Sequence, residues 1–157
     1  MHKPIAAAAS IAVSADPATV RAATLALDPV RIVQAKGFLP GVRSVVGVTA
    51  PWSAPGQTRT LTLTDGSTLT ETLVAIEEDG YRYRGSDYSG PFRFLVKEAN
   101  ARFAVAPRAD GATLSWTYEF TPKSGLAAAI LSFLVDSQWN AFMDATLERL
   151  KADIERA

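Results

Sequence analysis

The stretch LAAAILSFLVDSQWNAFMDATLERLKADIER, residues 126–156, contains neither proline nor glycine and favours one long helix. At 1.5 Å per residue this helix would be roughly 45 Å long, which exceeds the width of a compact domain of this size. Apolar side chains, with one threonine, recur along it at steps of three and four: Leu131, Val135, Trp139, Phe142, Met143, Thr146, Leu147, Leu150 and Ile154. A long helix with one continuous apolar stripe predicts a sheet that wraps around it.

The sequence before this helix predicts the strands of that sheet. Six runs of alternating or β-branched residues follow one another as an antiparallel meander, at residues 42–48, 58–64, 68–76, 81–88, 100–107 and 112–121. Asp-Gly pairs mark three of the turns between them. Residues 90–99 fit a strand or a loop equally well, and we expect an extended connection there.

Residues 5–13 also alternate and predict a first strand, although their apolar character loosely resembles a secretory signal. Two short helices should follow at residues 20–27 and 30–35. Asp16-Pro17 and Asp28-Pro29 open them, because aspartate caps free backbone amides and proline presets the first helical φ. The sequence therefore predicts an α+β chain with seven antiparallel strands, two short helices after the first strand, and a long C-terminal helix.

Composition excludes several classes of protein. The 157 residues suit one domain spanning the whole chain, with 48% apolar and 20% charged residues as in globular proteins. Sixteen basic residues balance sixteen acidic ones, so a nucleic-acid partner is not expected. Cysteine is absent and His2 is the only histidine, which argues against zinc sites and histidine-activated nucleophiles. We expect no metal, no cofactor, no membrane-spanning segment of about 20 apolar residues, and a cytoplasmic location.

Four segments stand at the ends and within the strands of this arrangement: Ser14-Ala15-Asp16-Pro17-Ala18-Thr19-Val20, Pro40-Gly41-Val42, Thr68-Leu69-Thr70-Glu71-Thr72-Leu73 and Ala112-Thr113-Leu114-Ser115-Trp116. By these segments and by the order of its elements the chain resembles the helix-grip proteins of the SRPBCC superfamily, which includes polyketide cyclases and dehydrases and START lipid-transfer domains. The chain is most similar to the bacterial polyketide cyclase/dehydrase-like branch, except that Arg21 stands where that branch commonly has tryptophan. The resemblance implies an apolar cavity between sheet and helix, and it implies no particular reaction.

Strand alternation predicts which side chains face that cavity. Alternate residues of each strand share a face, and the aromatic side chains of the last strand should point inward. Leu61 with Leu63, and Val46 with Val48, are among the pairs on other strands that should point inward as well. The residues that we expect to contact a ligand combine these faces with the helix stripe: Glu71, Tyr81, Tyr83, Phe103, Trp116, Tyr118, Val135, Trp139 and Phe142. Each could equally be an ordinary core residue.

Glu71 is the most informative charge, because it lies between two leucines on the expected inner face. It is either a cavity acid that binds a ligand hydroxyl or transfers a proton, or one half of a structural ion pair with Arg59, Arg82 or Arg84. We expect Arg82 and Arg84 themselves to lie on a solvated outer face. The turn at residues 77–79 should also be exposed to solvent.

The start of the long helix is apolar nearly all round, because four large side chains lie off the stripe: Leu126, Ile130, Phe133 and Leu134. Either the two short helices and the loop at residues 51–56 cover them, or they form an exposed patch that could support a homodimer. We expect the cover.

These features predict a binding protein for a small hydrophobic or amphipathic molecule, such as a lipid, a polyketide or an aromatic metabolite. The alternatives are a cyclase or dehydratase that uses the same cavity and a partner-binding or dimerising module. No catalytic residue is assigned, because the chain offers no histidine near the expected cavity.

Overall fold

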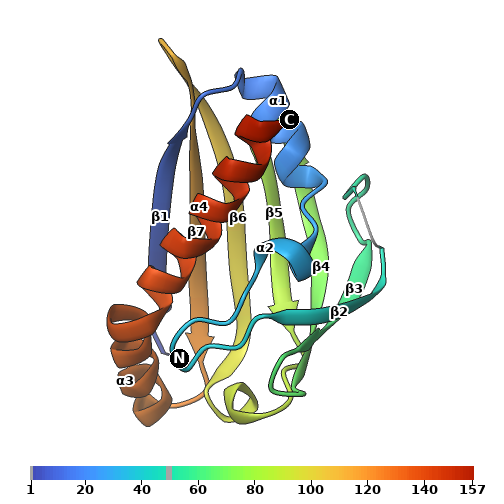
Figure 1. Ribbon diagram of the computed structural model, residues 1–157. Helices are drawn as coiled ribbons and strands as arrows, with labels where there is room; N and C mark the ends of the chain where they lie inside the picture. Colours follow the sequence, from blue (N-terminus) through green and yellow to red (C-terminus); the bar gives the residue numbers. More distant parts are fainter. Residues whose placement is uncertain (1, 49–50) are drawn as a thin grey trace.

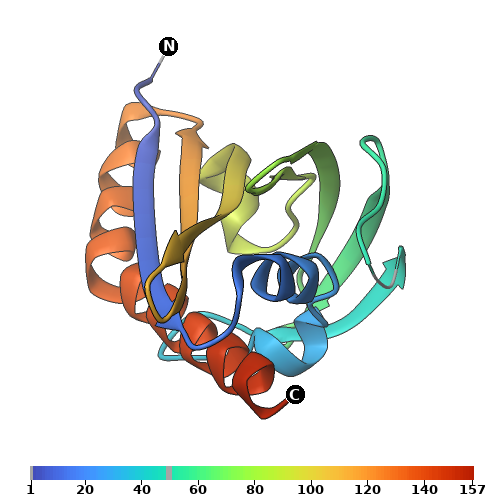
Figure 2. The same cartoon turned by 90° about the horizontal axis from the view of Figure 1, so that it is seen from above.

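The computed structural model describes residues 2–48 and 51–157 and contains one seven-stranded antiparallel sheet. Its order is β1-β7-β6-β5-β4-β3-β2, so the first strand of the chain pairs with the last. The strands are β1 Ile5–Val13, β2 Val42–Gly47, β3 Thr58–Leu63, β4 Thr68–Glu77, β5 Gly80–Ser86, β6 Val96–Arg108 and β7 Gly111–Pro122. Figure 1 and Figure 2 show them as one curved layer with the C-terminal helix along its concave side. The predicted fold class is confirmed.

Two short helices, α1 Pro17–Leu25 and α2 Pro29–Ile32, connect β1 to β2. The predicted caps are present: Asp16 accepts a hydrogen bond from the Thr19 amide at 2.9 Å, and Asp28 accepts one from the Val30 amide at 3.0 Å. The hydrogen bonds from Thr19 lower the pKa of Asp16. Helix α2 ends earlier than predicted, because Val33 is already extended and its carbonyl accepts from the Val42 amide.

The C-terminal helix runs without a break but changes its winding in the middle. It consists of α3 Gly125–Leu134, a π-helical segment η2 Val135–Trp139, and α4 Asn140–Arg156. The predicted stripe faces the sheet and is buried, with Trp139 partly buried. By length and composition alone this helix could cross a membrane, yet 28% of its most apolar 18-residue stretch is buried in the fold. That buried stripe is what a core helix of a globular protein requires.

We expected an extended connection at residues 90–99. The chain instead turns there and then joins the sheet. Gly90 has a φ of 71°, which lets the chain turn into the 3-10 helix η1 Pro91–Phe94. Strand β6 then begins at Val96, four residues before the predicted start. It is longer because β7 extends to Pro122 and pairs with Val96 there.

The predicted inward direction of Val46 is wrong, since its side chain is 71% exposed. A register shift between Val42 and Ser44 places Val45 opposite Leu61 and turns Val46 outward. Val48, which lies just after the strand, is partly buried against the core.

The expected cover over the start of the long helix is also wrong. Leu126 is 74% exposed and Phe133 is 69% exposed, whereas Ile130 and Leu134 are less so. Figure 1 shows the reason, because α1 and α2 lie toward the C-terminal end of α4, away from α3. The loop at residues 51–56 is also held near α1, where the Trp52 amide donates to the Leu25 carbonyl. Helix α3 therefore presents an apolar face to solvent.

Candidate functional site

A cavity of about 110 Å³ lies between the concave face of the sheet and the C-terminal helix. Strands β2 to β7 supply most of its wall, and the rest comes from α2 with the chain on either side of it, from η1 with the chain before it, and from η2 and α4. The lining side chains are mostly apolar. The few polar groups among them therefore determine what the cavity can bind.

Eight of the nine predicted ligand-contacting residues line this cavity: Glu71, Tyr81, Tyr83, Phe103, Trp116, Tyr118, Trp139 and Phe142. Their convergence follows from the register of the sheet, which places Phe103 opposite Trp116 and both Tyr83 and Tyr118 opposite Ala101. Val135 is buried in the core but is not among the described residues that line the cavity.

Aromatic rings form a continuous wall. Phe103 stacks on Trp116 with ring centroids 5.1 Å apart, and Tyr118 stacks on Phe120 at 5.4 Å. Trp139 from η2 meets the edges or faces of Tyr118 and Phe120 at nearly right angles, at 5.3 and 5.2 Å. Offset-stacked and perpendicular contacts of this kind are the favoured arrangements of aromatic rings, so each ring of the wall supports the orientation of its neighbours.

Tyrosine and tryptophan polar atoms form a short hydrogen-bonded chain on this wall. The Trp116 Nε1–H donates to the Tyr83 hydroxyl at 3.0 Å, and the hydroxyls of Tyr83 and Tyr118 are hydrogen-bonded at 2.9 Å. Three N–H or O–H groups thus share two hydrogen bonds, which leaves one hydroxyl hydrogen for another acceptor. Burial raises the pKa of Tyr83 and of Tyr118 well above the usual tyrosine value, so both remain neutral donors at physiological pH.

Trp139 adds a second unused donor. Its Nε1 is buried and has no hydrogen-bond partner among the described residues, although the side chain lines the cavity. A buried donor without a partner costs free energy unless a ligand or water supplies an acceptor. The aromatic wall therefore favours a molecule that carries a hydrogen-bond acceptor.

Glu71 faces the cavity and pairs with Arg59, so the structure joins two interpretations that the sequence had separated. The two residues are directly opposite in β3 and β4. The Arg59 Nε and Nη2 atoms both lie 2.8 Å from Glu71 Oε1, and the two side chains are only 8% and 10% exposed. Among the described residues no donor is hydrogen-bonded to Glu71 Oε2, so this oxygen can still accept a hydrogen bond.

Trp52 holds the arginine of this pair from the other side. The Arg59 guanidinium lies 4.3 Å from the centre of the Trp52 ring, which is buried. A cation over an indole ring gains electrostatic stabilisation, most of all when both are removed from water. The arginine is thus fixed by a carboxylate and an aromatic face, in line with its preference for planar partners.

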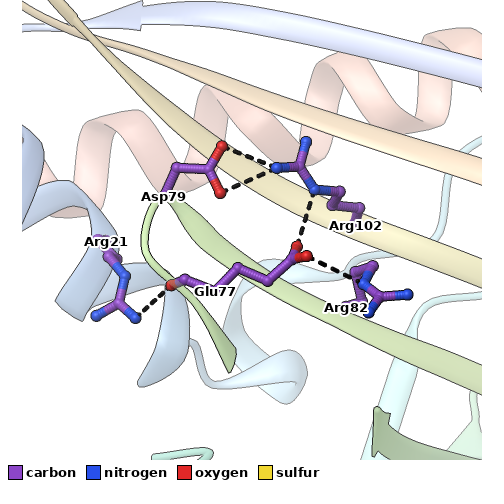
Figure 3. A network of polar contacts seen from close by, with 5 residues as sticks. All are labelled: Arg21, Glu77, Asp79, Arg82 and Arg102. Atoms are coloured by element: carbon purple, nitrogen blue, oxygen red, sulfur yellow. Dashed lines mark hydrogen bonds and ion pairs between the residues drawn. The ribbon is translucent and has the colours of Figure 1, made fainter. Parts of the chain in front are cut away.

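The outer face of the sheet carries a second group of charged side chains, which Figure 3 shows. Arg102 donates to Glu77 at 3.0 Å and to both oxygens of Asp79 at 2.9 and 2.8 Å, and Arg82 pairs with Glu77 at 3.3 Å. The side chains of Arg82 and Arg84 are 50% and 41% exposed, as predicted for an outer face.

Arg21 belongs to this group of charged side chains on the outer face. It stands where the branch that the sequence resembles commonly has tryptophan. Its Nη2 donates to the Glu77 carbonyl at 2.7 Å. The residue thus connects α1 to the end of β4, and it is not one of the described residues that line the cavity.

Several lining residues were missed by the sequence analysis. Tyr88 and Phe92 lie in or beside the segment whose structure the pattern left open, and Asp87, with a φ of 54°, ends the alternation before them. Four more come from the short helices and the chain around them: Leu27, Pro29, Val33 and Pro40. The available signal was the concentration of aromatic residues around Gly90-Pro91, which is unusual for a solvated loop.

Metal chemistry finds no support in the part of the chain that the structure describes, where no three His, Cys, Asp or Glu side chains are grouped as a metal site would need.

Comparison with known proteins places this geometry in context. The family model described as polyketide cyclase / dehydrase and lipid transport matches residues 4–155. Comparison with curated protein sequences finds no match.

Solved structures share the fold at low sequence identity. Ara h 8.0201 superposes with a TM-score of 0.68 at 15% identity, covering 98% of this chain and 99% of that one. The KanY protein has a TM-score of 0.66 at 20% identity and 99% coverage of both chains. The di-domain ARO/CYC protein StfQ from the steffimycin biosynthetic pathway gives 0.71 at 18% identity, with 98% of this chain matching 52% of StfQ.

Proposed function

The chain belongs to the polyketide cyclase, dehydrase and lipid-transport family of the SRPBCC superfamily, and on this basis we propose that its cavity binds a small aromatic or aliphatic molecule that carries one hydrogen-bond acceptor. The observation that carries the proposal is the cavity itself, in which an apolar aromatic wall surrounds a few buried polar atoms. Pockets of this composition bind by apolar burial and use the polar atoms to orient the ligand.

The size of the cavity supports a ligand, or the bound part of one, on the scale of a single ring. An engineered apolar cavity of about 150 Å³ in another protein binds benzene. The cavity here has about 110 Å³, so a ring fits it with small movements of the lining side chains. Longer lipids or polyketides would need larger rearrangements.

The polar atoms support an acceptor on that ligand. Two hydrogen-bond donors have no acceptor among the described residues: the spare hydroxyl hydrogen of the Tyr83 and Tyr118 pair, and the Trp139 Nε1–H. A ketone or ether oxygen would satisfy them, whereas a pure hydrocarbon would leave them without partners.

Acetophenone and ethylbenzene test this proposal, since they share a ring and differ in the carbonyl oxygen. Isothermal titration calorimetry should show that acetophenone binds more tightly, by several-fold to tenfold for one hydrogen bond. The double variant Tyr83→Phe with Tyr118→Phe removes both hydroxyls and should reduce the acetophenone affinity toward that of ethylbenzene, whereas either single variant leaves one hydroxyl hydrogen to donate. Arg82→Gln on the outer face is the matched control. Equal binding of the two compounds to the wild-type protein would contradict the acceptor, and no binding of either would contradict the ring-sized site.

A second function, a cyclase or dehydratase, is favoured by one observation: the carboxylate of Glu71 lines the same cavity as neutral tyrosine donors. General acid–base chemistry needs such groups near one ligand atom. Native mass spectrometry of freshly purified protein, followed by a denaturing run, identifies any molecule that it carries. Returning that molecule to fresh protein then separates the functions, because an enzyme converts it and Glu71→Gln stops the conversion. Unchanged affinity and unchanged turnover in Glu71→Gln would contradict any role of the carboxylate.

The proposal covers the whole chain as one ligand-binding domain and includes a cytoplasmic location. The location is tested by fractionating cells that express the full chain. Recovery of the protein outside the cytoplasm would contradict it.

A further inference from the structure

Exposed apolar side chains concentrate at one end of the molecule. Of the seven large hydrophobic residues that are exposed in the described part of the chain, three lie on one face of α3 at positions i, i+4 and i+7: Leu126, Ile130 and Phe133. Phe38 is 89% exposed and Phe94 is 65% exposed. We call these five residues the α3 surface.

The segments that carry the α3 surface meet at η2. The Phe38 amide donates to the Gln138 side chain at 3.4 Å, which places the chain after α2 against η2. The Phe92 ring packs against Trp139 with centroids 6.4 Å apart, which places η1 there as well. Helix α3 leads directly into η2, and Figure 1 shows α3 and η1 at the same lower end of the fold.

The segments that carry the α3 surface bear basic charges only, although the chain as a whole has no excess charge and Asp87, Glu119 and Asp136 directly flank these segments. Residues 33–41, 88–95 and 120–135 contain three basic residues, Lys36, Arg93 and Lys123, and no acidic residue. All three basic residues are exposed, and the Arg93 guanidinium lies 4.6 Å from the centre of the Phe94 ring. The first acidic side chain beyond α3 is Asp136. Protruding apolar groups surrounded by positive charge match an anionic lipid surface.

We propose that the α3 surface docks the protein reversibly on membranes that contain anionic lipids. Leu126, Ile130 and Phe133 would enter the boundary between headgroups and acyl chains, and Lys36, Arg93 and Lys123 would lie at the headgroups. This inference does not depend on what the cavity binds. It also explains why the C-terminal helix is apolar and long enough to span a membrane although its stripe packs against the sheet.

A second copy of the chain fits this surface less well. A two-fold interface would bring the same patch of each copy together, and hence Lys36, Arg93 and Lys123 against an identical basic set. Like charges across an interface oppose association, and residues 33–41, 88–95 and 120–135 contain no acidic residue to compensate them. An anionic bilayer supplies the opposite charge.

The docking surface adjoins the cavity. Two of the segments that meet at η2 also line the cavity, through Val33 and Pro40 after α2 and Phe92 in η1, and η2 itself lines it through Trp139. Docking would therefore place this part of the cavity wall close to the lipid.

Vesicle co-sedimentation tests the proposal on the full chain. Vesicles of phosphatidylcholine with about one-third phosphatidylserine should bind the protein, and vesicles of phosphatidylcholine alone should bind it at least tenfold more weakly, since each basic residue near an anionic surface contributes about fivefold. Phe133→Ser should reduce binding to the anionic vesicles about tenfold, and Lys123→Glu should reduce it by fivefold or more.

The matched control is Val46→Ser, which removes a similarly exposed apolar side chain from β2 and should leave vesicle binding unchanged. Circular dichroism verifies that each variant is folded, which is expected for exposed positions. Equal binding to both kinds of vesicle, or a loss with Val46→Ser equal to that with Phe133→Ser, would overturn the proposal. So would a dimer in sedimentation velocity that Phe133→Ser converts to a monomer, because the surface would then serve self-association.

Discussion

The two faces of the central strands both carry arginine–carboxylate pairs, but they place them in different surroundings. On the concave face Arg59 and Glu71 are about nine-tenths buried, and they are accompanied by buried tyrosines. On the outer face Arg102, Glu77 and Asp79 make more hydrogen bonds, yet about 40% of the Arg102 side chain remains in contact with water. Burial, rather than the number of contacts, therefore determines how much folding free energy is lost when one partner of an ion pair is removed.

Alkaline pH should produce the largest difference between the two faces. The four tyrosines of the chain are Tyr81, Tyr83, Tyr88 and Tyr118, and burial raises the pKa of each in the folded protein. In the unfolded chain they ionise near pH 10. Above that pH the unfolded state binds fewer protons than the folded state, so the free energy of unfolding falls as the pH rises. Each tyrosine lowers the free energy of unfolding by about 1.4 kcal/mol per pH unit, so all four together lower it by roughly 5.6 kcal/mol per pH unit.

Tyrosinate absorbance and far-ultraviolet circular dichroism, followed together from pH 8 to about pH 12, check this prediction. The two signals should change in a single coincident transition above about pH 10, because ionisation requires unfolding. The stability contributed by tyrosine burial is fully present below that range. The network in Figure 3 contains no tyrosine, so this transition reports on the concave face. Tyrosinate that forms in a protein with an intact dichroism spectrum would contradict the burial of these hydroxyls.

Replacing one partner of the buried pair should have the next largest effect. Arg59→Met leaves the Glu71 carboxylate in the cavity wall without the ion-pair partner that it has among the described residues, and we expect a loss of about 3–5 kcal/mol in the free energy of unfolding. Urea denaturation at neutral pH measures it. The double variant Arg59→Met with Glu71→Leu should recover most of the loss, because it removes both charges together. If the single and double variants lose the same amount, packing against Trp52 and not charge determines the stability of this site.

The concave face was largely predictable from sequence, because strand alternation and helix periodicity are local patterns. They placed Tyr83, Trp116 and Trp139 on surfaces that must meet once a long helix lies on a curved sheet. The choice of Arg59 as the partner of Glu71 was not predictable. It depends on the register between β3 and β4, and three arginines were compatible with the sequence.

Two errors originate in irregular backbone. A register shift in β2 turned Val46 outward, and the left-handed backbone conformation of Asp87 ended the alternation before Tyr88 and Phe92. The error about α3 has a different cause, because apolar residues are ordinarily assigned to a core. Only the three-dimensional path of α1 and α2 shows that these two helices do not cover it.

The smallest effect should come from the same substitution on the outer face. Arg102→Met removes three hydrogen bonds to carboxylates, whereas Arg59→Met removes one hydrogen bond and one further ion-pair contact with Glu71. The vacated carboxylates of Glu77 and Asp79, however, remain in contact with water. We therefore expect a loss below about 1 kcal/mol, which shrinks further as salt is added because exposed pairs are screened. Urea denaturation at low and high salt measures both quantities beside Arg59→Met. A loss in Arg102→Met as large as that in Arg59→Met would mean that the network in Figure 3 fixes the β4–β5 turn as a unit, and that contact number outweighs burial in this sheet.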